Sequence, residues 1–207
     1  MEPTQVYLFS SPLGFERSKE LFSYPTARMG KVYKPLDEGT DSYKVRWVVE
    51  MSWMTPKRAF MGAAAAEGGT KLNAFDNALL KLGIGNVNLV KLSSVIPAHI
   101  EWIEKVHDVP IGMLLPTVYA HIESDEPGMT ISAALGVGIS EGNEGGLIYE
   151  YSGYCTKKEA EEMVRKMVEE GFAVRGWKLK EFRVVSAEIT VKDKPAAVVA
   201  AVVMFPY

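Results

Sequence analysis

Two adjacent serines, Ser93 and Ser94, could carry out chemistry on their own backbone. The Ser94 hydroxyl is placed to attack the Ser93 carbonyl through a five-membered ring, which converts the peptide bond between them into an ester. β-Elimination of that ester would then cut the chain. A serine pair is also common at turns and strand ends, so the pair alone leaves both interpretations open.

Other patterns with recognised chemistry are incomplete. His99, His107 and His121 lack the spacing that a zinc hydrolase requires, so structural or surface roles are expected. Cys155 has no partner cysteine or CxxC neighbour and is expected to be a passive thiol. Gly83-Ile84-Gly85 begins like a dinucleotide-binding motif but lacks its third glycine and follows a predicted helix. Neither a metal nor a nucleotide is therefore expected.

Composition and charge describe an ordinary globular chain. Its 207 residues are 47% hydrophobic and 24% charged, with a net charge of -3, and are most simply one domain. Basic and acidic residues are interspersed, so nucleic acid is not expected as a partner. The start, 1–5, lacks the pattern of a secretory signal, which favours a cytoplasmic location. The longest apolar run, 195–205, is about half of a membrane span and predicts a buried strand.

The segment before the serines predicts a helix followed by a strand. Apolar residues at i, i+3, i+4 and i+7 begin at Phe75, with Asn73 as the expected N-cap and Gly83 as the expected stop. Residues 86–92 alternate as a strand does, which places the serine pair at the strand's end. Asn88 lies an even number of positions before Ser94, so an unbroken strand would turn both to one face.

Beyond the serines, strands are expected over 113–124, 129–139, 147–152, 182–191 and 196–205, and one upstream over 43–51. Between them, Thr156 and Glu159 form a capping box for a helix that Gly171 is expected to end. This order predicts an α+β layered domain of mainly antiparallel sheet rather than a doubly wound parallel sheet. We expect that domain over 55–207, after an N-terminal extension of unknown role over 1–54.

Three stretches together resemble the pyruvoyl-dependent arginine decarboxylase family. They are LNAFDNALL at 72–80, GIGNVNLVKLSSVIP at 83–97 and GLIYEY at 146–151, with supporting matches at 115–117 and 130–134. Their order and spacing also agree, over roughly 55–205. The resemblance implies an αββα sandwich that cleaves itself between Ser93 and Ser94.

The resemblance also implies the cofactor and the reaction. Residue 94 would become a pyruvoyl group whose ketone reacts with the α-amino group of L-arginine and accepts the electrons released as CO2 leaves, giving agmatine. Glu150 would then protonate the product carbon. In an extended strand, Glu150 shares one face with Ile148 and Ser152, whereas Leu147, Tyr149 and Tyr151 share the other. Asn88 would donate a hydrogen bond to the Ser93 carbonyl during self-cleavage.

By the same resemblance, Asp76 meets the substrate guanidinium, and Leu79, Gly85 and Val87 line the substrate pocket. Each also has an ordinary structural interpretation. An aspartate early in a helix is commonly a capping or dipole residue, and the other three suit a helix core position, a turn and a strand.

Family sites form between subunits, so the resemblance implies a homo-oligomer, either a trimer or a dimer of trimers. Two alternatives remain open. The chain could be a related pyruvoyl enzyme acting on another amino acid or on S-adenosylmethionine. It could instead be an unprocessed, silent relative that keeps the fold as a structural or regulatory subunit.

Overall fold

The structure is a computed structural model that describes residues 29–35, 43–49, 55–106 and 109–205. The chain divides into two compact units, Met1–Glu50 and Met51–Tyr207. In the first unit, β1 (Met29–Pro35) pairs antiparallel with β2 (Tyr43–Val49), which matches the strand expected over 43–51. His107 lies outside the described residues.

Two sheets form the second unit. The five-stranded sheet has the order β4-β7-β11-β3-β6. Its strands are β3 (Arg58–Glu67), β4 (Asn88–Lys91), β6 (Glu101–Ile103), β7 (Leu114–Ser124) and β11 (Ala196–Phe205). The four-stranded sheet has the order β10-β8-β9-β5. Its strands are β5 (Val95–Ile96), β8 (Thr130–Ser140), β9 (Gly146–Gly153) and β10 (Leu179–Thr190). All pairs are antiparallel except β3–β6 and β4–β7.

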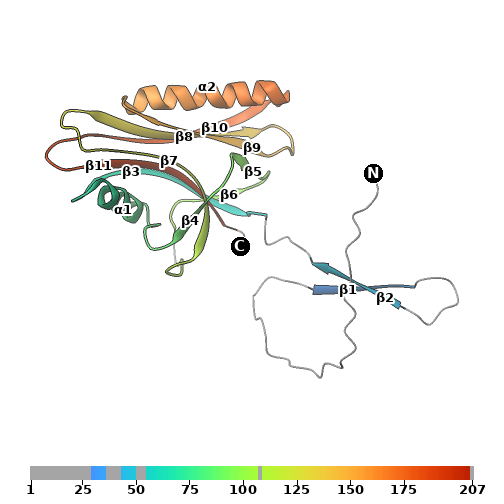
Figure 1. The fold of residues 1–207 in the computed structure, drawn as a ribbon. Coiled ribbons are helices and arrows are strands. Elements are labelled where there is room, and N and C mark those ends of the chain that lie inside the picture. The colour runs from blue at the N-terminus through green and yellow to red at the C-terminus, as the bar shows by residue number, and fades with distance from the viewer. Residues whose placement is uncertain (1–28, 36–42, 50–54, 107–108, 206–207) are drawn as a thin grey trace. The chain divides into compact units, whose positions relative to one another are not determined.

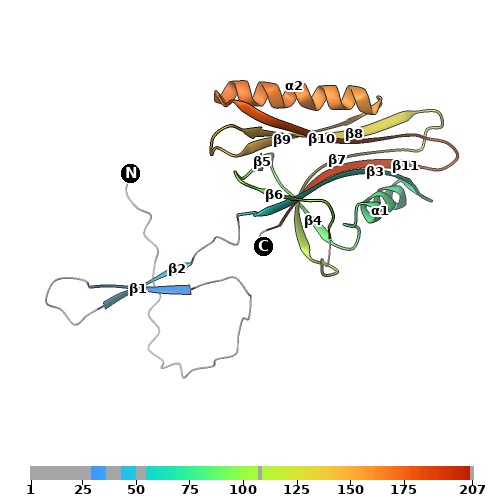
Figure 2. The same cartoon turned by 180° about the vertical axis from the view of Figure 1, so that it is seen from behind.

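The two sheets pack face to face, and one helix covers the outer face of each (Figures 1 and 2). Helix α1 (Lys71–Lys81) lies on the five-stranded sheet and α2 (Lys157–Arg175) on the four-stranded sheet. These layers confirm the expected α+β sandwich of the αββα type. Among the described residues, no helix is both long and apolar enough to cross a membrane; the cytoplasmic location stays a prediction.

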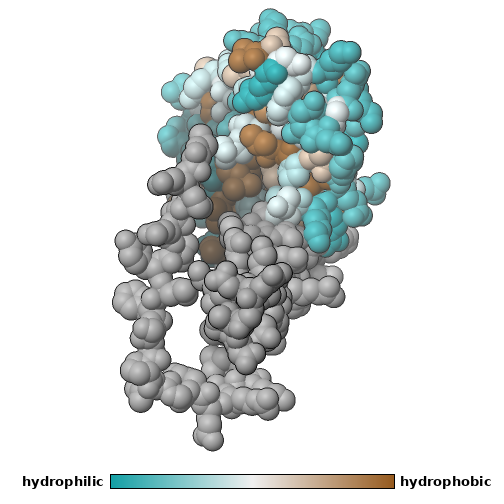
Figure 3. Space-filling view, turned by 90° about the vertical axis from the view of Figure 1, so that its right-hand side faces the viewer, coloured by the Kyte–Doolittle hydropathy of each residue, from teal (hydrophilic) through white to brown (hydrophobic). Residues whose placement is uncertain are grey.

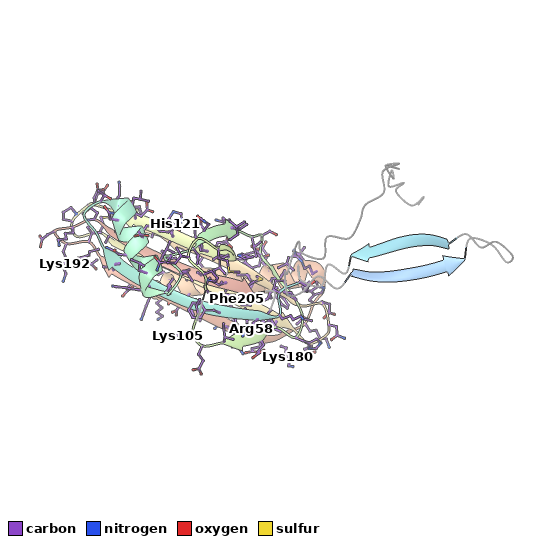
Figure 4. All side chains as sticks on the ribbon, turned by 90° about the horizontal axis from the view of Figure 1, so that it is seen from below. Arg58, Lys105, His121, Lys180, Lys192 and Phe205 are labelled. Atoms are coloured by element: carbon purple, nitrogen blue, oxygen red, sulfur yellow. The ribbon has the colours of Figure 1, made fainter. Side chains whose placement is uncertain are left out.

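β11 is the central strand of the unit and is buried along its whole length. Val198, Ala200 and Val202 pack between the sheets, whereas the residues between them pack against α1. A strand buried on both faces is apolar without alternation, which explains the run in the sequence. Figure 4 shows Lys192, in the turn before β11, at one end of the unit, and Arg58 and Phe205 toward the other.

Helix α2 starts as expected but ends later. The capping box between Thr156 and Glu159 is present. The predicted end at Gly171 is wrong, because the helix continues to Arg175 and stops at Gly176, which has φ 65°. Gly171 lies inside the helix, where a Cβ would overlap the Tyr149 hydroxyl. The glycine therefore allows α2 to lie close to β9.

Helix α1 begins earlier than expected. Its N-cap is Thr70, whose Oγ1 accepts a hydrogen bond from the Asn73 backbone N–H at 3.1 Å, so the predicted Asn73 cap is wrong. Thr70 can act as the N-cap because its backbone is extended and its side chain lies within reach of the N–H of Asn73, three residues later. The helix does end before Gly83, which has φ 76°.

After α1, the chain passes from one sheet to the other. The strand expected over 86–92 is shorter, since β4 ends at Lys91, and Val95 already belongs to β5 of the four-stranded sheet. Ser93 and Ser94 therefore lie in a crossing segment, 92–94. The expectation that one unbroken strand turns Asn88 and Ser94 to the same face is wrong.

Candidate active site

The crossing segment is tied to both sheets by backbone hydrogen bonds. Leu92 N–H donates to Thr117 O of β7 at 3.0 Å, and Ile148 N–H of β9 donates to Ser94 O at 2.9 Å. Ser94 is partly buried and Ser93 is exposed. The peptide bond between the two serines is thus held at fixed points on either side.

Ser93 carries the carbonyl that the Ser94 hydroxyl would attack. The backbone N–H of Val95 donates to this carbonyl oxygen at 3.1 Å, closing a three-residue turn around Ser94. A donor at this position stabilises the negative charge that develops on the oxygen during attack. The family resemblance implies this function for Asn88, whose side-chain amide donates to Gly112 O at 2.8 Å in the structure. The role of Asn88 in self-cleavage stays a prediction.

Glu150 faces the Ser94 side of β9, as its strand position predicted. Its neighbour Ile148 is buried between the sheets, whereas Tyr149 and Tyr151 pack toward α2. The Glu150 carboxylate Oε2 lies 3.5 Å from Ser94 Oγ. This distance is at the long limit of a hydrogen bond, so the two groups are neighbours with a weak interaction.

Lys91, which the sequence did not single out, is the third polar side chain of the cluster. Its Nζ lies 4.0 Å from Glu150 Oε1 and 5.1 Å from the centroid of the Tyr119 ring. No sequence pattern marks it beyond its place in the 83–97 motif, because the pairing brings together strands of two different sheets.

A mainly apolar cavity of about 670 Å³ lies beside Ser93. It is lined by Pro56, Leu92, Ser93, Val95, Ile96, Pro97, Met113, Leu114, Pro116, Glu144 and Met204. Glu144 is the one charged residue of this lining. The pKa of Glu144 is below its ordinary value because its own backbone N–H and the Ser140 hydroxyl donate hydrogen bonds to it. The cavity therefore has a carboxylate at its rim at neutral pH.

The predicted substrate residues lie apart from this cluster within one chain. Asp76 is exposed on α1 and has no ion pair or side-chain hydrogen bond with another described residue. Leu79 and Val87 pack in the core between α1 and the five-stranded sheet. Gly85 is partly buried, and a Cβ there would meet Leu80. None of the four lines the cavity.

The remaining residues with possible chemistry have local partners. His99 Nε2 lies 3.0 Å from Asn143 Oδ1, and the His121 ring packs against the Phe75 ring in a tilted arrangement with centroids 4.9 Å apart. Cys155 Sγ lies 3.1 Å from Ser132 Oγ. In the part of the chain that the structure describes, no group of three or more His, Cys, Asp or Glu residues could hold a metal ion.

Comparison with known proteins places this site in a family. The profile described as pyruvoyl-dependent arginine decarboxylase matches residues 58–207. The curated pyruvoyl-dependent arginine decarboxylase of Thermococcus kodakarensis is 90% identical over 157 residues, which are 76% of this chain and 100% of that protein. That of Pyrococcus abyssi is 85% identical over 158 residues, with the same shares. That of Methanocaldococcus jannaschii is 46% identical over 151 residues, 72% of this chain and 91% of that protein.

The site therefore combines a serine pair in the segment between two sheets with a carboxylate beside Ser94, and the matched profile describes pyruvoyl-dependent enzymes. The chain belongs to the pyruvoyl-dependent arginine decarboxylase family. Members of this family have a covalently bound pyruvoyl group derived from a serine. The residues of this chain fit that group, because Ser94 Oγ has Glu150 beside it and the preceding carbonyl has the Val95 N–H as a donor.

Proposed function

We propose that this chain cleaves itself between Ser93 and Ser94 and then decarboxylates L-arginine to agmatine and CO2. The observation that carries the proposal is the position of the serine pair in the crossing segment, with Glu150 Oε2 3.5 Å from Ser94 Oγ. Family membership supports the choice of arginine.

Each residue near Ser94 has a distinct task. Ser94 supplies the attacking oxygen for cleavage, and the Val95 N–H stabilises charge on the Ser93 carbonyl oxygen. The Ile148 N–H holds the Ser94 carbonyl, which remains after cleavage, on β9. The pyruvoyl group supplies a ketone that captures the substrate amine and accepts electrons. Glu150 then delivers a proton to the product carbon.

We assign Asp76 to the substrate guanidinium, with Leu79, Gly85 and Val87 shaping the pocket around it. An exposed carboxylate without an ion pair to another described residue is free to take a planar guanidinium through two parallel hydrogen bonds. Asp76 lies on α1 and outside the lining of the cavity beside Ser93, which favours a site that two subunits complete.

A homo-oligomer, a trimer or a dimer of trimers, is the assembly we propose. Two apolar residues of the cavity lining are exposed, Val95 at 55% and Leu114 at 67%, and Ile111, three residues before Leu114, is 88% exposed. Figure 3 shows brown hydrophobic side chains among the polar ones on this side of the unit. Exposed apolar groups that lie together mark interaction surfaces. Light scattering of the purified protein measures the assembly.

Intact-mass spectrometry tests the function. The expected result is two fragments, 1–93 and 94–207, the second with a blocked N-terminus, together with agmatine and CO2 release from arginine. A protein that stays full-length after long incubation would contradict the proposal and favour the silent relative. A cleaved protein that prefers ornithine, lysine or S-adenosylmethionine over arginine would favour the related pyruvoyl enzyme.

A further inference from the structure

We propose that Lys91 is a positioning residue of this site: it orients the Glu150 carboxyl group and, once the chain is cut, offsets the new negative charge at Ser93. This inference rests on the proposed function and extends it to a residue that the family resemblance did not assign.

The position of Lys91 is set by the last residue pair of β4 and β7. Lys91 pairs with Thr117, and its side chain is on the same side of the sheet as Leu89, which packs toward α1. The ammonium lies over the Tyr119 ring, 5.1 Å from its centroid. A cation over an aromatic face is attracted to it. The Tyr119 ring therefore restrains the end of the Lys91 side chain, although 57% of this side chain is exposed.

From this position Lys91 reaches across to the other sheet. Its Nζ is 4.0 Å from Glu150 Oε1, while Oε2 of the same carboxylate faces Ser94 Oγ at 3.5 Å. The two oxygens of Glu150 therefore have different neighbours. With Oε1 turned to the ammonium, Oε2 is turned to residue 94, where the product carbon will need its proton.

Self-cleavage changes the charge of the cluster. Attack of Ser94 Oγ on the Ser93 carbonyl carbon breaks the C–N bond, passes the hydroxyl proton to the Ser94 nitrogen and forms an ester. A base then removes the Ser94 Cα proton, the Cβ–Oγ bond breaks, and Ser93 leaves as a carboxylate. Water then hydrolyses the remaining dehydroalanine to the pyruvoyl group and releases ammonia. The cut thus adds one negative charge two residues from Lys91 and close to Glu150, and bound arginine brings a second carboxylate. A nearby ammonium lowers the repulsion among these groups.

Three variants test this role: Lys91→Met, which keeps the packing on Tyr119, Lys91→Arg, which keeps the charge, and Lys71→Met as a matched control. Lys71, whose side chain is exposed to a similar extent as that of Lys91, forms a 3.3 Å ion pair with Asp125 that involves no residue of the Ser94 cluster. The measurements are the cleaved fraction by intact mass, kcat and KM for arginine, and the melting temperature.

We expect Lys91→Met to cleave fully, with kcat about tenfold lower and KM changed less than about threefold, because a misplaced proton donor slows a step after binding. Lys91→Arg should recover most of kcat, and Lys71→Met should match the parent. In a readout independent of activity, Lys91→Met should lower the melting temperature of cut protein more than that of uncut Ser94→Ala protein. We expect the decrease in melting temperature to be about 1 to 3 °C larger in the cut protein, which is the size expected for an exposed ion pair.

Several results would overturn the inference. A parental kcat in Lys91→Met would remove the positioning role, and a raised KM with unchanged kcat would make Lys91 a binder of the substrate carboxylate instead. Equal melting shifts in cut and uncut protein would contradict the charge role. If Lys91→Met fails to fold, Lys91→Gln is measured in its place. A parent that neither cleaves nor decarboxylates would refute the proposed function itself, and this inference with it.

Discussion

Ser94 and Glu150 are neighbours that act at different stages. Their 3.5 Å separation is long for a hydrogen bond, so the uncut chain does not depend strongly on this contact. We expect Ser94→Ala to remain full-length, since it lacks the attacking oxygen. Glu150→Gln should cleave, yet its kcat should fall by roughly 10² to 10⁴, the usual worth of a general acid. Intact mass and agmatine formation separate the two effects, and a parental kcat in Glu150→Gln would exclude it as the proton donor.

Substrate choice is a second question at the residue scale, and two carboxylates are candidates for binding the guanidinium of arginine. Asp76 is exposed on α1, and Glu144 lies at the rim of the cavity beside Ser93. A hydrogen bond to a charged group contributes about 1.5 to 3 kcal/mol, so Asp76→Asn should lower kcat/KM for arginine by one to two powers of ten. Ornithine should be a poor substrate for the parent, and Glu144→Gln is the matched control. If Glu144→Gln rather than Asp76→Asn loses the preference for arginine, the guanidinium partner is Glu144 in the cavity instead of Asp76.

The family resemblance assigned Ser94 and Glu150 to one site, and the structure brings Ser94 Oγ and Glu150 Oε2 to within 3.5 Å. Their catalytic roles stay predictions. Lys91 and the Val95 N–H were missed, since both depend on the change of sheet after Lys91. The same change removed the geometric argument for Asn88. Periodicity predicts which face of a strand a residue occupies, but it does not predict the residue at which the strand ends.

At the scale of elements, β11 was predicted over its full length, whereas β3 was missed. Both strands are rich in Ala, but β11 also contains the branched Val residues that mark a strand. In β3 the run 63–66 is all Ala, which by itself favours helix. Its small side chains form a strand because they pair with β11 and leave room for α1. Tertiary packing therefore overrides local propensity here.

Close packing of α2 on β8 yields a stability prediction. A Cβ at Gly138 would lie 2.5 Å from Val168 Cγ1 and 2.6 Å from Phe172 Cε2. Gly138→Ala must therefore displace α2, and we expect it to cost about 1 to 3 kcal/mol of unfolding free energy. Gly69→Ala, where a Cβ would meet nothing within 4 Å, is the control. Denaturant titration compares the unfolding midpoints of the two variants. Equal midpoints would show that α2 can move away from Gly138→Ala without loss of unfolding free energy.

The capping box of α2 predicts a pH effect. The Thr156 backbone N–H, followed by the Thr156 hydroxyl, lowers the pKa of Glu159 from its ordinary 4.5 by donating hydrogen bonds to its carboxylate. Because the folded pKa is the lower one, the stabilisation is complete above the unfolded pKa and is lost as pH falls through the folded pKa. The melting-temperature difference between the parent and Glu159→Gln should therefore narrow from neutral pH to below 4.5. A difference independent of pH would contradict this origin.

At the scale of the whole molecule, the two sheets do more than enclose a core. One sheet provides Lys91 and Tyr119 and the other provides Glu150 and the Ile148 N–H. The bond to be cut lies in the segment that joins them. Both halves of the chain contribute their own strands to the sandwich, β3 and β4 before the cut and β5 to β11 after it. Cleavage can therefore leave the sandwich intact.

Lys91, Ser94 and Glu150, which form the Ser94 cluster, all lie in the second unit, Met51–Tyr207. The family match begins at residue 58, and the Thermococcus kodakarensis relative is matched over its full length by 157 residues of this chain. We therefore expect a protein that starts at Met51 to cleave itself into 51–93 and 94–207. Its kcat/KM for arginine should stay within about twofold of the full chain, because the residues assigned to cleavage, proton transfer and substrate binding all lie between 76 and 150. Ser94→Ala in the same short protein is the uncut control. Loss of cleavage or of assembly in the short protein would show that residues 1–50 take part in building the site.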